Sequence, residues 1–153
     1  MINTKDYNSL VQKLREFFLH KGFVEVPVQS RLSILAACED PFTVEQFKWD
    51  DKVWPLPQTG QMWLEYELLK NPDFPGIFCI STSYRNEPNP IPGRHETIFP
   101  MFEFETKGTM SDLIRMESEL LQYLDLPLPT LHNYEDLATH YGVDIIETEH
   151  EGK

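Results

Sequence analysis

The sequence predicts an α+β domain in which helices flank a mainly antiparallel sheet. Apolar residues recur at helical spacing in residues 4–21 and 110–124. Residues 77–85 and 97–107 instead alternate with the period of two that is typical of strands. Because a proline-containing loop joins these two segments, we expect them to pair as a hairpin.

Composition indicates one globular domain of 153 residues, with 41% hydrophobic and 12% aromatic residues. No apolar run approaches the roughly 20 residues of a membrane helix, and the first residues lack a signal-peptide pattern, so we predict a cytoplasmic protein without a membrane partner. The net charge of −12 disfavours binding to a phosphate backbone, although one or two arginines suffice for a small anion.

Two distant cysteines, Cys38 and Cys79, predict reduced thiols, and Cys79 lies in an apolar run that favours packing.

The N-terminal part predicts a helix, a strand and a second helix. The first helix, 4–21, ends at Gly22, and residues 23–27 then form a short strand that ends at a proline. Residues 29–37 predict a small helix, and the acidic and proline residues of 38–41 predict a loop.

Residues 42–54 predict two short strands around a turn at Asp50 and Asp51. A turn over 55–60 leads to a helix over 61–70. We expect core positions for the three tryptophans, which are Trp49, Trp54 and Trp63.

The C-terminal third predicts two helices with recognisable ends. Thr109 precedes the helix over 110–124, and Asp112 three residues later completes a capping pair. The last helix, 134–141, has a capping residue on each side, Asn133 and Gly142.

The predicted hairpin carries an unusual set of side chains on one face. The period of two places small residues beside an arginine on the first strand: Cys79, Ser81, Ser83 and Arg85. It places an aromatic ring and two acids on the second strand: Phe99, Met101, Glu103 and Glu105. Cations near the loop, Arg85, Arg94 and His95, suit a polyphosphate, because guanidinium matches phosphate oxygens. The pattern fits equally well an exposed hairpin with ordinary ion pairs such as Arg85–Glu103.

These residues resemble motif 2 of class II aminoacyl-tRNA synthetases: Tyr84-Arg85-Asn86-Glu87, Arg94-His95, Phe99 and Glu103-Phe104-Glu105. Three further segments resemble the same family in its order. They are residues 22–27, which are similar to motif 1; Thr59-Gly60-Gln61-Met62 with Glu65, which is similar to a segment of asparaginyl enzymes; and residues 144–151, which resemble another run of that branch. The resemblance covers nearly the whole chain, so we interpret 1–153 as the N-terminal part of a catalytic domain, with motifs 1 and 2.

The resemblance implies a role for each matched residue. Arg85 would hold the ATP α-phosphate and the amino-acid carboxylate, and would be the catalytic residue. Phe99 would stack on adenine, Glu87 would meet the adenine amino group, and Arg94 or His95 would lie near the outer phosphates. Gln61, Glu65 and Glu103 would line the amino-acid pocket, and Glu39 would close over it. Glu65 on its helix is equally compatible with a solvated charge. ATP and Mg²⁺ are the implied cofactors, with Mg²⁺ on the phosphates and no metal site in the protein itself.

The sequence departs from the family pattern in several places. Ile98 replaces a usual glutamate, and Leu64 replaces a lysine with which aspartyl enzymes bind substrate. The glycine-rich motif 3 is not found, so we expect the C-terminal part of the fold to be missing. We also expect no anticodon-binding barrel, because the motif 1 segment lies near Met1.

Three functions follow as alternatives. The first is ATP-dependent activation of an amino acid, asparagine or aspartate, by an aminoacyl-tRNA ligase that dimerises through residues 5–30. The second is a stand-alone relative that forms asparagine or modifies a protein; the acidic surface favours it, although tRNA stays possible. The third is a truncated, non-catalytic fragment that only dimerises or binds ATP.

Overall fold

A computed structural model describes residues 3–28 and 40–142. Its elements follow in the order α1 (Thr4–His20), β1 (Val24–Glu25), β2 (Gln46–Trp49), β3 (Lys52–Pro55), α2 (Gln61–Lys70), β4 (Gly76–Tyr84), β5 (Ile98–Thr106), α3 (Met110–Tyr123) and α4 (Tyr134–Tyr141). The predicted α+β class is confirmed, and each predicted helix or strand over these elements is found near its expected position. The predicted helix over 29–37 lies outside the described residues.

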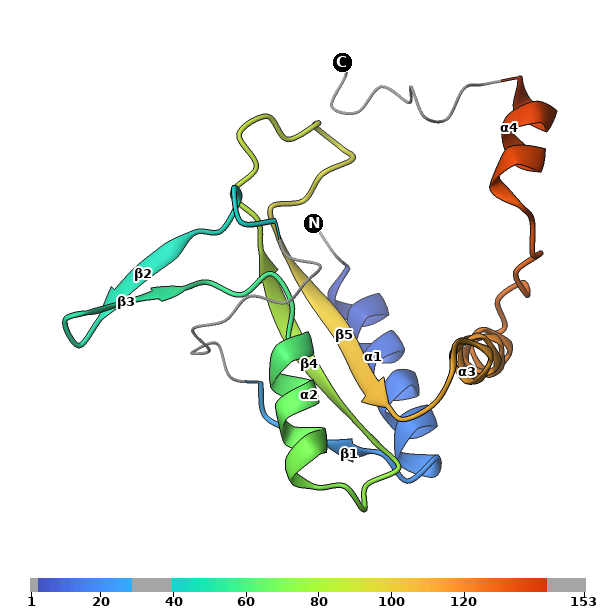
Figure 1. Ribbon diagram of the computed structural model, residues 1–153, viewed down its shortest axis with the longest axis horizontal. Coiled ribbons are helices and arrows are strands. Elements are labelled where there is room, and N and C mark those ends of the chain that lie inside the picture. Colours follow the sequence, from blue (N-terminus) through green and yellow to red (C-terminus); the bar gives the residue numbers. More distant parts are fainter. Residues whose placement is uncertain (1–2, 29–39, 143–153) are drawn as a thin grey trace.

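A three-stranded sheet in the order β1-β4-β5 forms the centre of the molecule (Figure 1). β4 and β5 pair antiparallel over nine residues each, as predicted. β1 pairs parallel with β4 through only two residues, Val24 and Glu25. The predicted strand over 23–27 is therefore shorter than expected. Its hydrogen bonding to β4 ends before Pro27, because proline has no N–H to donate.

Helices cover the two faces of this sheet, with α1 behind it and α2 in front of it in Figure 1. On one face of the sheet lies a buried aromatic cluster, which consists of Phe17, Phe18, Phe23 and Phe78. Partly buried side chains of β5 and α3 pack against this cluster. The other face packs on α2 through Leu64, Ile77 and Cys79. Burying one apolar face of each helix against the sheet is what stabilises these otherwise short helices.

The helix ends form as the sequence predicts. Thr109 and Asp112 make a reciprocal capping box at the start of α3. Asn133 accepts a hydrogen bond at the start of α4, and Gly142 adopts the left-handed conformation at its end. Figure 1 shows α4 apart from the sheet.

A separate hairpin, β2–β3, projects from the sheet. Its turn lies at Asp50 and Asp51, as predicted, and both residues have positive φ, 51° and 56°, as a two-residue hairpin turn requires. Trp49 on this hairpin is 65% exposed, so the expected core position is wrong for this residue. The reason is that, among the described residues, β2 pairs only with β3, and this hairpin projects away from the central sheet and its helices.

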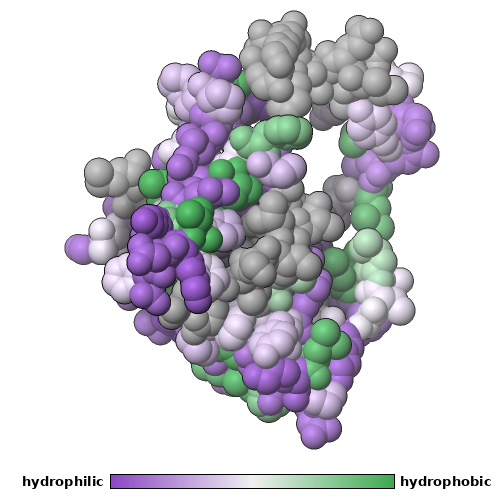
Figure 2. All heavy atoms as spheres, turned by 60° about the vertical axis from the view of Figure 1, so that its left-hand side comes forward, coloured by the Kyte–Doolittle hydropathy of each residue, from purple (hydrophilic) through white to green (hydrophobic). Residues whose placement is uncertain are grey.

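The surface in Figure 2 is mainly hydrophilic, with small hydrophobic areas between polar residues. Within the described residues, no helix is both long and apolar enough to span a membrane.

Candidate active site

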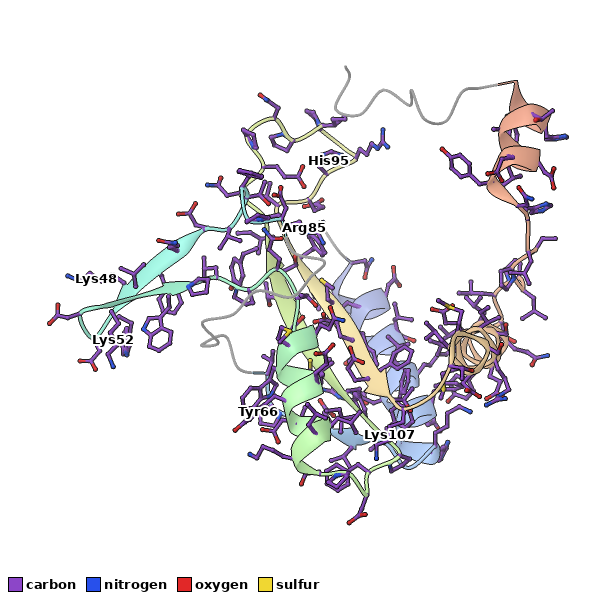
Figure 3. All side chains as sticks on the ribbon, viewed as in Figure 1. Lys48, Lys52, Tyr66, Arg85, His95 and Lys107 are labelled. Atoms are coloured by element: carbon purple, nitrogen blue, oxygen red, sulfur yellow. The ribbon has the colours of Figure 1, made fainter. Side chains whose placement is uncertain are left out.

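The register of β4 and β5 brings the predicted side chains onto one face of the sheet. Ser83 lies opposite Phe99, and Cys79 lies opposite Glu103. Residues opposite each other in an antiparallel pair project to the same side, so the predicted common face is confirmed. Arg85 follows the last paired residue of β4, at the point where the loop leaves the sheet (Figure 3).

The Arg85 guanidinium lies over an aromatic ring. Its central carbon is 5.4 Å from the centre of the Phe99 ring, and its Nε donates a hydrogen bond of 3.3 Å to Ser83 Oγ. Arg85 is exposed, whereas Ser83 beneath it is fully buried. Arg85 and Glu103, both described by the structure, do not form the ion pair that a simple surface hairpin predicted. A positive charge next to an open ring is therefore available to a ligand.

The Glu103 carboxylate accepts hydrogen bonds from three donors. The hydroxyls of Thr59 and Ser81 donate to one oxygen each. The backbone N–H of Gly60 lies 2.9 Å from both oxygens. Gly60 directly precedes α2 and has no side chain to cap the helix, so the carboxylate of Glu103 takes this role.

The loop between the strands carries the other predicted phosphate and adenine residues. His95 Nδ1 lies 2.7 Å from a Glu87 carboxylate oxygen, and both side chains are about a quarter exposed, at 24% and 27%. The contact is close without being an aligned hydrogen bond, because this Nδ1 has no hydrogen-bond partner. Arg94 is exposed. Lys48, Lys52 and Lys107 lie away from Arg85 (Figure 3).

A cavity of about 550 Å³ opens beside β5, between the start of α2 and the start of α3. Gln61 and Glu103 from the predicted amino-acid pocket line it, together with three further acids, Glu105, Asp112 and Glu117. Burial raises the pKa of Glu105, and the nearby charges of Glu65 and Glu103 raise it further. No lysine or arginine lines the cavity among the described residues.

Two of the remaining predicted residues, Gln61 and Glu65, lie in the first half of α2, and the third, Glu39, belongs to a segment outside the described residues. Gln61 donates from its amide to Glu65 Oε1 at 3.4 Å, in the first turn of α2. Glu65 is exposed and does not line the cavity. Glu39 lies outside the described residues.

Cys79 lies opposite Glu103 on the neighbouring strand and packs between the sheet and α2. It is fully buried, and burial, with a smaller effect of the Glu103 charge, raises the pKa of its thiol to about 12. The predicted packing role of Cys79 is therefore confirmed.

Sequence reasoning did not select Thr59 and Ser81 as site residues. The alternation of β4 already placed Ser81 on the right face. The sequence lacked any signal for the register that brings this serine and the distant Thr59 to the same carboxylate.

Comparisons of the sequence with protein-family models and with curated proteins found no match. Comparison of the structure with solved structures found similar proteins. Asparaginyl-tRNA synthetase from Pyrococcus horikoshii, complexed with asparaginyl-adenylate, has a TM-score of 0.67 and 26% identity over 76% of this chain and 26% of that chain. Asparaginyl-tRNA synthetase from Entamoeba histolytica has a TM-score of 0.71 and 18% identity over 92% of this chain and 36% of that chain. A putative aspartyl-tRNA synthetase from Leishmania major Friedlin has a TM-score of 0.59 and 21% identity over 86% of this chain and 22% of that chain.

The chain therefore has the fold of part of a class II aminoacyl-tRNA synthetase core, as its motifs predicted. The three similar structures reported above are asparaginyl and aspartyl enzymes of that class. The chain spans 26% of the length of the Pyrococcus enzyme and 36% of the length of the Entamoeba enzyme.

Proposed function

We propose that this chain binds ATP and a small amino acid, asparagine or aspartate, and takes part in forming an aminoacyl-adenylate. The observation that carries the proposal is the shared face of the hairpin, where an exposed guanidinium, an aromatic ring and a fixed carboxylate lie together. The similar Pyrococcus structure is complexed with asparaginyl-adenylate, which supports this choice.

The chemistry requires an amino-acid carboxylate oxygen to attack the α-phosphorus of ATP while pyrophosphate leaves. Negative charge builds up on the α-phosphate oxygens during this displacement. Arg85 would stabilise that charge and align the two reactants, so no covalent nucleophile of the enzyme is needed. Phe99 would stack on adenine and Glu87 would accept from its amino group. Arg94 and His95 would contact the outer phosphates.

For the amino acid we propose Gln61, Glu65 and Glu103 as the pocket, with Glu39 closing over it. The acidic lining of the neighbouring cavity favours asparagine over aspartate, because a second carboxylate would be repelled. Leu64 favours the same choice, since it is fully buried where the aspartyl enzymes carry a substrate-binding lysine.

Mg²⁺ would accompany ATP as its phosphate-bound ion. In the described part of the chain, no group of three or more His, Cys, Asp or Glu side chains is arranged to hold a metal ion. We therefore assign no metal site to these residues and no step to the ion.

The net charge of −12 favours a small acceptor or a protein over tRNA as the final recipient of the activated amino acid. The stand-alone asparagine-forming or protein-modifying function is thus our second candidate. Supplying ATP with aspartate and ammonia, and following the formation of asparagine and AMP, tests the asparagine-forming candidate. Supplying ATP with asparagine and tRNA, and following aminoacyl-tRNA and AMP, tests tRNA charging.

We also propose that the chain dimerises through residues 5–30. Two leucines of α1 in this range support this, because Leu10 and Leu19 are 47% and 53% exposed. Light scattering of the wild type and of Leu10→Glu tests it: the variant should be a monomer and the wild type a dimer.

The test of the main proposal is direct binding, followed by exchange. ATP and asparagine should each bind in calorimetry, and labelled pyrophosphate should exchange into ATP only when the right amino acid is present. Binding of ATP without exchange for any amino acid would leave the non-catalytic alternative. Absence of ATP binding would overturn the proposal.

A further inference from the structure

The backbone around Arg85 is held from both edges of the strand end. The pairing of β4 with β5 stops at Tyr84, so Arg85 lies just beyond it. The Arg85 N–H donates a hydrogen bond of 2.8 Å to the Thr97 carbonyl, on the β5 side. The next N–H, that of Asn86, donates one of 2.9 Å to the Thr43 carbonyl on the other side, since successive N–H groups of an extended chain point to opposite edges. The direction in which the Arg85 side chain leaves the strand therefore depends on where Thr43 lies.

Thr43 belongs to a turn, residues 40–43, that precedes β2 and passes beside the end of β4 (Figure 1). The Thr43 N–H donates a hydrogen bond of 3.2 Å to the Asp40 carbonyl. The Phe42 N–H donates one of 2.9 Å to the Asp40 carboxylate, as in a turn closed by an aspartate side chain. These bonds lie within the turn, so they shape it without fixing its place against the sheet.

The side-chain amide of Gln58 fixes that place. Its Oε1 accepts a hydrogen bond of 2.9 Å from the Asp40 N–H. Its Nε2 donates to the Asp40 carbonyl at 3.2 Å and to the Thr43 hydroxyl at 2.9 Å. A primary amide has two N–H donors and one carbonyl oxygen, and all three groups of Gln58 are used on this one turn. Gln58 is only 4% exposed, and a buried amide without such partners would be costly.

The backbone beside Gln58 is itself attached to the end of β4. The residue before it, Pro57, accepts through its carbonyl a hydrogen bond of 2.9 Å from the Tyr84 N–H. Tyr84 and Asn86 are the two neighbours of Arg85 in the chain. Both are therefore held from the side on which Gln58 lies, one through Pro57 and the other through the turn over 40–43.

We infer that Gln58 is a positioning residue for Arg85: it holds the turn over 40–43 so that the Thr43 carbonyl fixes the backbone next to the guanidinium. This inference rests on the proposed function, in which Arg85 binds the α-phosphate of ATP. It assigns Gln58 no contact with a ligand, because its amide is buried and bonded within the protein.

The experiment measures ATP binding by calorimetry in four variants of the full chain, at a temperature at which circular dichroism shows each variant to be folded. Gln58→Met removes the amide at similar side-chain volume. Thr43→Val removes the hydroxyl to which Gln58 donates, and Thr43→Ser retains it. Asn71→Ala is the matched control, because the Asn71 amide also donates to a backbone carbonyl, that of Glu67 at 2.9 Å, but does so at the far end of α2.

We expect Gln58→Met to weaken ATP binding about tenfold or more, because it removes three hydrogen bonds from the turn. Thr43→Val removes fewer and should weaken it about threefold or more. Thr43→Ser and Asn71→Ala should bind ATP as the wild type does, even where Asn71→Ala lowers the melting temperature. Retained affinity in the serine variant separates positioning by the hydroxyl from a loss of packing.

Two outcomes overturn the inference and leave the proposed function standing. The first is unchanged ATP affinity in Gln58→Met or, where that variant does not fold, in Thr43→Val. The second is a loss in Thr43→Ser as large as that in Thr43→Val, or a loss in Asn71→Ala as large as that in Gln58→Met, which indicates a general structural effect. A wild type that binds no ATP instead overturns the proposed function, and the inference with it.

Discussion

The guanidinium of Arg85 stacks on Phe99, 5.4 Å from the ring centre, and forms no ion pair with Glu103. The period-two pattern of the hairpin was compatible both with a ligand-binding face and with a surface ion pair between Arg85 and Glu103. The carboxylate of Glu103 accepts hydrogen bonds from Thr59, Gly60 and Ser81 instead of from Arg85. The Arg85 guanidinium therefore contacts the Phe99 ring. The proposed phosphate-binding cation, Arg85, and the proposed amino-acid-pocket carboxylate, Glu103, therefore do not neutralise each other.

Arg85→Ala should abolish ATP binding and leave folding nearly intact. The side chain is exposed, and an exposed cation–π contact contributes only about 0.5–1 kcal/mol. Calorimetry with ATP and thermal unfolding measure the two effects. The control is Arg115→Ala, which removes an arginine paired with Asp112 on α3. A loss of several kcal/mol of stability in Arg85→Ala would identify a structural arginine instead.

Glu105→Gln should stabilise the protein as the pH rises. Burial raises the pKa of this carboxyl, so the folded state binds its proton more tightly than the unfolded state does. Stability is therefore complete below the unfolded pKa and declines as the pH rises through the higher folded pKa. Glutamine cannot ionise, and the advantage of the variant in thermal unfolding should grow from about pH 4 to about pH 7. Glu96→Gln, at an exposed position, should show no such trend.

Cys79 should resist alkylation as long as the protein is folded. Its thiol is fully buried and its pKa is raised to about 12, so almost no thiolate forms at about pH 8. Mass spectrometry after iodoacetamide treatment of a Cys38→Ser variant checks this. Labelling should become fast in urea, and equally fast labelling without urea contradicts the buried position.

Gly76→Ala should destabilise the fold by about 1–3 kcal/mol, the usual cost of overpacking. An added Cβ would lie 2.4 Å from the Phe23 ring, in the aromatic cluster against the sheet. Denaturant unfolding measures the cost. Combining the change with Phe23→Leu should give less than the sum of the two single effects, and strict additivity would show that the ring is not the obstacle.

The sequence by itself determined the local elements and the face that each side chain takes. The first strand of the hairpin was predicted at 77–85 and runs over Gly76–Tyr84, and its small residues share a face with Arg85 as expected. The Thr109–Asp112 box and the Asn133 cap were likewise predicted and formed. These features depend on contacts within a few residues, which alternation, helical period and capping preferences describe.

Only the tertiary structure decided which side chains meet. Thr59 lies 44 residues before its partner Glu103, and the pair exists because the β4–β5 register and the packing of α2 bring both to one point. The conformation of the loop between β4 and β5 brings Glu87 to His95, and Trp49 is exposed because its hairpin projects from the central sheet. The strand register and the position of α2 depend on how complete apolar surfaces pack against each other. A pattern of a few residues does not specify that packing.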